Sequence, residues 1–347
     1  MISHAPPQHS LYVDDADGAY ATTLNDVLLH GEEMVGGKSQ SVGSERLFKE
    51  LLNYCIHVKN PIERLIYNPV HRLNLPVAIA RFVWMMAGSD RLQDIAFYEN
   101  RVRYFSDDGI IVPGSSFGQR ILRSRPGLNQ LTSVINRLKK DTHTRRAAIS
   151  IYQPEDSARD SKDIPCAFGL FYHVRQNQLQ ATTVMRSNNA FALLPYNMFE
   201  FSLLAELVAC EIRIPLGTLT HSVVSMHVYE NDYEAARSVC DAYQDHISLE
   251  RNPVPVMPNS ASPLDQVREL VILESLLRHE SASINTSNIG QWISKGEDKL
   301  VDYWRQFYYI LLWYVLNRRR EDDCSVIVES IITEPWLSFL SKKTLLN

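Results

Sequence analysis

The sequence predicts an α+β fold, in which a sheet packs against helices and a further helical region follows. Strand-like patterns cluster between residues 146 and 228, and helix-like patterns lie on both sides of that cluster. The Pro-rich stretch NPVPVMPNSASP at 252–263 then precedes a part that reads as mostly helical. These shifts predict a flexible N-terminus (1–19), a domain with the sheet (20–245), a linker (246–263) and a helical C-terminal extension (264–347).

In the first half of the chain, helix and strand signals alternate. YATTLNDVLLH (20–30) predicts a helix that ends at Gly31, and GGKSQSVGS (36–44) predicts a loop. ELLNYCIHV (50–58) predicts an extended segment, and LPVAIARFVWMMA (75–87) predicts an apolar helix that stops at Gly88. An amphipathic helix is expected over 128–140, because its two final lysines suit a helix C-terminus.

The second half begins with three predicted strands. They are RRAAISIYQP, IPCAFGLFYHV and LQATTVMRSNNAF, and the last two are expected to be neighbours joined by a turn at Gln176-Asn177. A buried helix (198–210), a last strand (218–228) and another helix (230–244) follow. FYYILLWYVL (307–316) has about half the length that a membrane span needs, so it predicts a buried helix.

Composition narrows the function classes. A net charge of −5 argues against a nucleic acid as the main partner. Five cysteines, an odd number without a CxxC pair, argue against a disulfide framework and a structural zinc site. The N-terminus lacks the pattern of a signal peptide and no apolar run is long enough for a membrane, so we expect a cytoplasmic protein.

Cys166 and Arg186 form the first candidate site. Pro165 restricts the backbone before Cys166 and can present its thiol at a sheet edge, although a lone cysteine is more often a core residue. Arg186-Ser187 lies twenty residues later, a distance over which a hairpin can return the chain to Cys166. The guanidinium and hydroxyl suit a phosphate, and an arginine near the thiol favours the thiolate.

Two further pairs are candidates for ligand binding. Arg145 and Arg146 are adjacent before a strand, so their charges point to opposite faces and rarely serve one site in one chain. The alternative is that both arginines lie at a solvent-exposed strand edge and bind no ligand. His227 and Tyr229 lie on one side of a strand, where they could reach a sugar hydroxyl; the alternative is a core histidine with a packing tyrosine.

Together these segments resemble the thymidylate synthase family, which includes the deoxycytidylate, deoxyuridylate and cytidylate hydroxymethylases. The stretches that match most specifically, in order and spacing, are DTHTRRAAISIYQP, IPCAFGLFYHVRQNQLQATTVMRSNNAFALLPYNMFEFSLL and SMHVYENDYEAA. Weaker matches are KNPIERLIYNP, FVWMMAG and GSSFGQR. The resemblance covers about residues 20–240 and implies a twisted mixed sheet packed with helices, in a homodimer with shared active sites.

The resemblance also implies roles for single residues. Cys166 would add to C6 of a pyrimidine nucleoside 5′-monophosphate, so that C5 becomes nucleophilic and receives a methyl or hydroxymethyl group. Methylenetetrahydrofolate would donate that group, and no metal is implied. The residues implied to bind substrate are Arg145 and Arg146 from the neighbouring subunit, Arg186, Ser187, Asn189, Asn197, His227 and Tyr229. Asn197 would read the edge of the base, and His227 and Tyr229 the 3′-hydroxyl.

The chain departs from the family pattern where folate and protons would be handled. Arg81 stands in the E-x-x-W segment in place of the catalytic glutamate, which removes the acid or base at that position. Ala167, Phe117, Met185, Asn189 and Leu193 replace the usual His, Tyr, Gln, Asp and Gly. The phosphate-binding arginine loop near the N-terminus has only Arg46 as a match.

These departures leave several functions open. The chain is a divergent C5-transferase, an enzyme that uses the same adduct for a folate-independent C5 reaction, or a nucleotide-binding protein without a full catalytic set. A fourth possibility is an unrelated cysteine hydrolase in which His173 or His227 activates Cys166, although neither histidine lies in a recognisable nucleophile–base frame. The sequence leaves open the base, the sugar, the product and the role of the extension.

Overall fold

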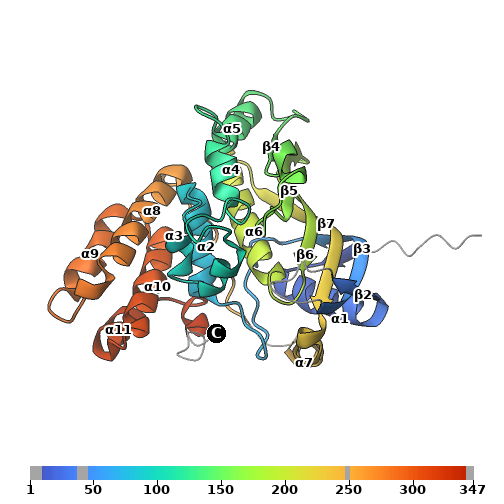
Figure 1. Cartoon of the computed structure of the whole chain (residues 1–347). Coiled ribbons are helices and arrows are strands. Elements are labelled where there is room, and N and C mark those ends of the chain that lie inside the picture. Colours follow the sequence, from blue (N-terminus) through green and yellow to red (C-terminus); the bar gives the residue numbers. More distant parts are fainter. Residues whose placement is uncertain (1–9, 37–45, 247–250, 341–347) are drawn as a thin grey trace, which may run out of the picture.

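A seven-stranded mixed sheet runs through the molecule, as the computed structural model shows for residues 10–36, 46–246 and 251–340 (Figure 1). Its strands are β1 (Ser10–Val13), β2 (Glu32–Gly36), β3 (Arg46–Val58), β4 (Ala148–Ser150), β5 (Ala167–Arg175), β6 (Gln178–Asn189) and β7 (Leu216–Tyr229). Their order is β1-β3-β7-β6-β5-β4, with β2 also paired to β3. The β1–β3 and β6–β7 pairs are parallel and the others are antiparallel.

The hairpin predicted for IPCAFGLFYHV and LQATTVMRSNNAF, which form β5 and β6, is confirmed. β5 and β6 pair antiparallel across Gln176 and Asn177, which both have positive φ, 51° and 55°. Two successive left-handed residues give a turn whose twist matches that of the strands. The hairpin fixes the register of the strands that carry Cys166 and Arg186.

Helices cover one face of the sheet and leave the other face open (Figure 1). The helices are α1 (Ala16–His30), α2 (Leu75–Ala87), α3 (Leu92–Ala96), α4 (Phe117–Arg123), α5 (Gln130–Lys140), α6 (Leu194–Ile212), α7 (Tyr233–His246), α8 (Pro263–His279), α9 (Ile289–Lys299), α10 (Asp302–Arg318) and α11 (Asp322–Glu329). The predicted ends of α1 at Gly31 and of α2 at Gly88 are confirmed, and Gly88 adopts the left-handed conformation with φ 60°.

The C-terminal helices pack on α2 and α6 and share one hydrophobic core with the sheet. α10 contains the predicted buried helix, and its Trp304 and Phe307 rings lie against Phe82 and Phe199. The Pro-rich segment before α8 is also fastened, because Val254 and Met257 are buried and donate backbone hydrogen bonds to Glu63 and Glu206. The division of the chain at 246–263 stays a prediction.

Two expectations need correction, and one lies outside the described residues. Regular structure is present inside the segment 1–19 that was expected to be flexible, because β1 pairs with β3 and Asp15 caps α1 there. β4 is only three residues long, because the chain turns into a 3-10 helix (Pro154–Ser157) soon after it. The predicted loop at 36–44 lies almost entirely outside the described residues.

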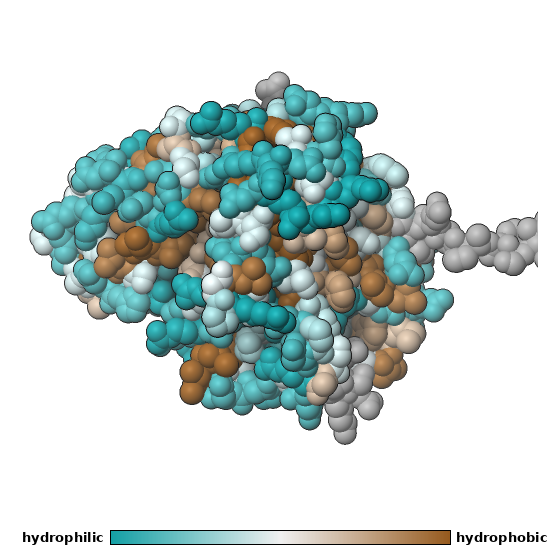
Figure 2. All heavy atoms as spheres, turned by 90° about the horizontal axis from the view of Figure 1, so that it is seen from above, coloured by the Kyte–Doolittle hydropathy of each residue, from teal (hydrophilic) through white to brown (hydrophobic). Residues whose placement is uncertain are grey.

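The surface seen from above is mostly hydrophilic, with small hydrophobic patches between polar side chains (Figure 2). Across the described ranges, we find no helix that combines the length and the apolar character that a membrane span requires.

Candidate active site

Four strand ends meet at one end of the sheet. β5 begins there, after Cys166, and the antiparallel β6 ends there after Arg186 and Ser187. β7 runs parallel to β6 and ends there at His227 and Tyr229, and the antiparallel β3 begins there. The topology therefore gathers motifs that are up to about sixty residues apart in sequence, as the hairpin argument predicted for Cys166 and Arg186.

Arg186 holds the segment that precedes Cys166. Its backbone N–H donates to the carbonyl of Cys166 at 2.8 Å. Its guanidinium donates from Nε to the carbonyl of Pro165 at 2.8 Å and from Nη2 to that of Ile164 at 2.9 Å. Nη1 has no bond among these contacts, and it is the donor that a phosphate could meet first.

The Cys166 thiol is half-buried, and its pKa is raised above the usual value. Desolvation by burial is the largest cause; Arg186 lowers this pKa, and Asp163 raises it. The expected effect of Arg186 is therefore present, but the expectation of a favoured thiolate was wrong, because burial outweighs the guanidinium.

Alkylation of Cys166 by iodoacetamide is expected to be slow at pH 7.5 and to accelerate up to and above pH 9, because only the thiolate reacts and the pKa of this thiol is raised. Arg186→Gln should slow the reaction further at a fixed pH, since it removes the group that lowers this pKa. Peptide mass spectrometry of Cys166 over a pH series measures both rates. A rate that is already maximal at pH 7 would contradict the argument.

His227 and Tyr229 lie together beside Ser187. Their rings are 5.1 Å apart in an edge-to-face contact, and His227 Nδ1 is 3.5 Å from the Ser187 hydroxyl. Burial lowers the pKa of His227 to about 4, so its ring is neutral at pH 7. The Arg46 guanidinium lies 5.6 Å from the centre of the Tyr229 ring, which adds a cation to this group.

Asn197 and Asn189 differ in what their side chains do. Asn197 is buried in the first turn of α6, and its Oδ1 accepts from Asn188 Nδ2 at 3.0 Å. Asn189 Oδ1 accepts from the backbone N–H groups of Phe191 and Ala192 at 3.0 and 2.9 Å. The Asn189 oxygen thus holds the loop before α6.

Arg81 lies between two carboxylates, those of Glu99 and Glu200, which the sequence did not predict as its partners. Its Nη1 pairs with Glu99 at 2.8 Å, its Nε pairs with Glu200, and its guanidinium lies 5.4 Å from the centre of the Tyr196 ring. Glu200 follows Asn197 by one turn of α6. Burial, the largest cause, raises the pKa of Glu200, while Arg81 lowers it and Glu99 raises it.

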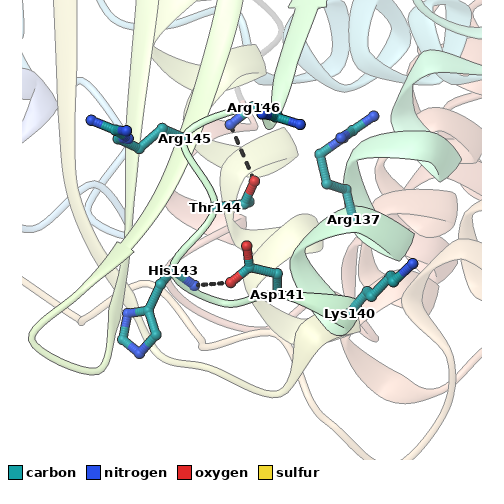
Figure 3. Close-up of a pocket in the computed structure, with 7 residues that line it drawn as sticks. All are labelled: Arg137, Lys140, Asp141, His143, Thr144, Arg145 and Arg146. Atoms are coloured by element: carbon teal, nitrogen blue, oxygen red, sulfur yellow. Dashed lines mark hydrogen bonds between the residues drawn. The ribbon is translucent and has the colours of Figure 1, made fainter.

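Arg145 and Arg146 lie far from Cys166 in the same chain. The carbonyl of Ala147 accepts from the N–H of Tyr172, and six residues along β5 separate Tyr172 from Cys166, roughly 20 Å. Both arginines line a hollow of about 600 Å³. Figure 3 shows their side chains pointing away from each other, as the sequence predicted, and shows Arg146 directed towards Arg137.

Several polar residues close to this site were not identified from the sequence: Glu99, Thr183, Asn188, Glu200 and His221. Thr183, Asn188 and Glu200 lie inside the stretch that carries the resemblance, but no single residue there signals its own role. Their partners come from elements distant in the sequence, such as His221 for Asn188 and Arg81 for Glu200. In the part of the chain that the structure describes, no three His, Cys, Asp or Glu side chains are arranged to hold a metal ion.

Comparisons with known proteins agree with this architecture. A sequence model of the family described as thymidylate synthase matches residues 19–255, which is more than half of the chain. A deoxyuridylate hydroxymethyltransferase of Bacillus phage SP01 is 28% identical over 229 residues, which cover 62% of this chain and 60% of the phage protein. A thymidylate synthase of Lactococcus lactis is 27% identical over 169 residues, which cover 47% of this chain and 59% of that protein.

The fold is also found among solved structures. Thermostable thymidylate synthase A from Bacillus subtilis aligns with a TM-score of 0.56 at 17% identity, over 72% of this chain and 90% of the other. The chain spans about 60% of the length of the Bacillus phage SP01 protein and of a second phage relative, a deoxyuridylate hydroxymethyltransferase of Delftia phage PhiW-14.

Proposed function

Because the chain belongs to the thymidylate synthase family, we propose that it transfers a methyl or hydroxymethyl group to C5 of a pyrimidine nucleoside 5′-monophosphate through a covalent bond between Cys166 Sγ and C6. Deoxyuridylate is the first substrate to test, because it is the substrate that the names of the phage relatives give. The observation that carries the proposal is the strand register that puts Cys166 beside Arg186 at the end of the sheet where His227 and Tyr229 lie.

The gathered side chains suit a nucleotide. Nη1 of Arg186, which bonds to none of the described residues, and the Ser187 hydroxyl supply donors for the 5′-phosphate. The neutral His227 and the Tyr229 hydroxyl supply hydrogen-bonding groups for the 3′-hydroxyl of the sugar. Asn197, with one amide oxygen and one amide nitrogen, supplies an acceptor and a donor for the edge of the base.

The chemistry begins when Cys166 gives up its proton to solvent and its Sγ adds to C6 of the pyrimidine. The electron pair of the C5–C6 double bond then moves to C5 and the C4 carbonyl oxygen. In the exchange reaction, C5 takes up a proton from water. In the transfer reaction, C5 would bond to the carbon of a one-carbon donor as the bond between that carbon and its donor breaks, and a hydroxymethyl product would also need a water and a methyl product a hydride from the donor. Loss of the original C5 hydrogen as a proton, followed by departure of Sγ from C6, restores the double bond and the thiolate.

The residues around Arg81 do not fit a folate. The Arg81 guanidinium covers the Tyr196 ring on which a flat pterin could stack, and two carboxylates hold it there. Asn189 Oδ1 is used by the loop, and Leu193 adds a side chain where the family has glycine. Methylenetetrahydrofolate stays the donor that the resemblance implies, and we derive no step through it.

These contacts favour a second candidate function, a folate-independent reaction at C5 that proceeds through the same Cys166 adduct. It requires the nucleotide contacts and the thiol but neither a pterin surface nor a carboxylate at position 81. The two candidates differ in one requirement, the presence of the folate.

We also propose that the protein is a homodimer with shared active sites. The face of the sheet that no helix of the described residues covers exposes Phe168, Phe171, Leu52 and Val224, with exposed fractions between 37 and 57%. Apolar side chains gathered on one open face indicate a protein interface. A two-fold dimer through this face would bring Arg145 and Arg146 of one subunit to the other, which agrees with their distance from Cys166 in their own chain.

Release of tritium from [5-³H]-dUMP tests the function. The wild-type protein is expected to release tritium, and Cys166→Ala is expected to reduce the release to background. Release only with methylenetetrahydrofolate supports one-carbon transfer, and release without it supports the second candidate. Absence of release with each of labelled dUMP, dCMP, UMP and CMP, while nucleotide binding survives Cys166→Ala, would show a binding protein instead.

A further inference from the structure

A buried chain of hydrogen bonds ends on Asn197. Thr183 Oγ1 lies 2.5 Å from His221 Nδ1, and His221 Nε2 lies 2.9 Å from Asn188 Oδ1. Asn188 Nδ2 then donates to Asn197 Oδ1 at 3.0 Å. All four side chains are buried, with exposed fractions of 0 to 3%, so none of these bonds competes with bulk water.

The chemistry of the partners fixes the direction of the chain. Asn188 Oδ1 is an amide oxygen that only accepts, so His221 Nε2 must carry the proton. Burial lowers the pKa of His221 to about 3, so the ring is neutral and its Nδ1 is left as an acceptor for the Thr183 hydroxyl. Every hydrogen in the chain therefore points from Thr183 towards Asn197.

The reverse direction is blocked by a backbone carbonyl. Asn188 Nδ2 also lies 3.4 Å from the carbonyl oxygen of Asn189 and donates to it. If the Asn188 amide turned over, its Oδ1 would face this carbonyl oxygen, acceptor against acceptor. The Asn197 amide cannot turn over alone either, because its Nδ2 would then face the Asn188 Nδ2, donor against donor.

We propose that Thr183, His221 and Asn188 are positioning residues that select the base, by holding the Asn197 amide in one orientation. The proposal rests on the function proposed above, in which Asn197 reads the base. Uracil presents a donor at N3 and an acceptor at C4, and cytosine presents the opposite pair. A fixed amide matches one of these patterns, whereas an amide free to turn over matches both.

The test compares the dissociation constants of dUMP and dCMP by calorimetry. The wild-type protein is expected to bind one of the two at least about tenfold more tightly, with dUMP preferred. Asn188→Leu should bring the ratio of the two constants close to one, mainly because the disfavoured nucleotide binds more tightly. Thr183→Val, which removes only the hydroxyl at nearly constant size, should lower the ratio in the same direction, and Thr183→Ser should restore it.

The matched control is Asn68→Leu. Asn68 is as buried as Asn188, and it donates to the carbonyl of Val239, outside the hydrogen-bond chain that ends on Asn197. This variant should therefore change stability without changing the ratio of the two dissociation constants. A variant that only destabilises the fold weakens the binding of both nucleotides by the same factor and leaves the ratio of their dissociation constants unchanged. If Asn188→Leu does not fold, Thr183→Val provides the same comparison.

The outcomes separate this inference from the function on which it rests. An unchanged ratio in folded Asn188→Leu or Thr183→Val, together with loss of binding in Asn197→Ala, would overturn the role of the chain and leave the proposed function standing. A wild-type protein that binds dUMP and dCMP equally would also overturn it. A wild-type protein that binds no pyrimidine monophosphate would overturn both proposals.

Discussion

Replacement of Glu206 by alanine is expected to lower the free energy of unfolding by about 3–5 kcal/mol, because it leaves the Arg64 charge buried without a carboxylate. Arg64 Nη2 pairs with Glu206 Oε2 at 2.5 Å, with side-chain exposures of 0 and 2%. Glu206 Oε1 also accepts from the N–H of Met257 at 2.7 Å. Tyr303 on α10 accepts from Arg64 at 3.1 Å, so the same cluster joins α6 to the C-terminal helices.

Urea denaturation measures this loss, and two further variants interpret it. Asp14→Ala removes the partner of Lys59 in a pair that is more than 80% exposed on both sides, so it should cost at most about 1 kcal/mol. Arg64→Met combined with Glu206→Leu removes both charges and should recover most of the loss. A loss below about 1 kcal/mol in Glu206→Ala would show that the C-terminal helices do not depend on this cluster.

Two inactive variants are expected to restore activity when they form a mixed dimer. Cys166→Ala lacks the proposed nucleophile, and a chain with both Arg145→Ala and Arg146→Ala lacks the groups that the partner's site would use under the proposed dimer. In the mixed dimer, the double-variant chain keeps its own Cys166 and receives both arginines from its partner, so one of two sites is complete. Random mixing makes half of the dimers mixed, so we expect about a quarter of wild-type tritium release.

The control for this experiment is Arg186→Ala mixed with Cys166→Ala. Arg186 bonds to the residues next to Cys166 in its own chain, so neither site of that mixed dimer is complete and no activity should return. Subunits with different affinity tags allow the mixed dimer to be purified and counted. Mixed dimers that form but stay inactive in the first experiment would show that each site uses only its own chain.

Much of the fold could be predicted from the sequence because the signals are local. The turn at Gln176-Asn177 and the stop at Gly88 depend on the backbone freedom of a few residues. The hairpin then places Cys166 beside Arg186 by register alone, and the alternation along β7 puts His227 beside Tyr229. Arg145 and Arg146 also point in opposite directions, as predicted, although both lie just before β4 and not within it.

The sequence by itself thus determined the α+β class, the hairpin, and the proximity of Cys166 to Arg186 and of His227 to Tyr229, because each depends on period, turn chemistry or register over short distances. The tertiary structure decided which distant polar groups meet. It paired Arg81 with Glu99 and Glu200, joined Thr183 to Asn197 through His221 and Asn188, and raised the pKa of Cys166 by burial. Burial and partner choice for a single polar residue depend on elements far away in the chain, and no local pattern encodes them.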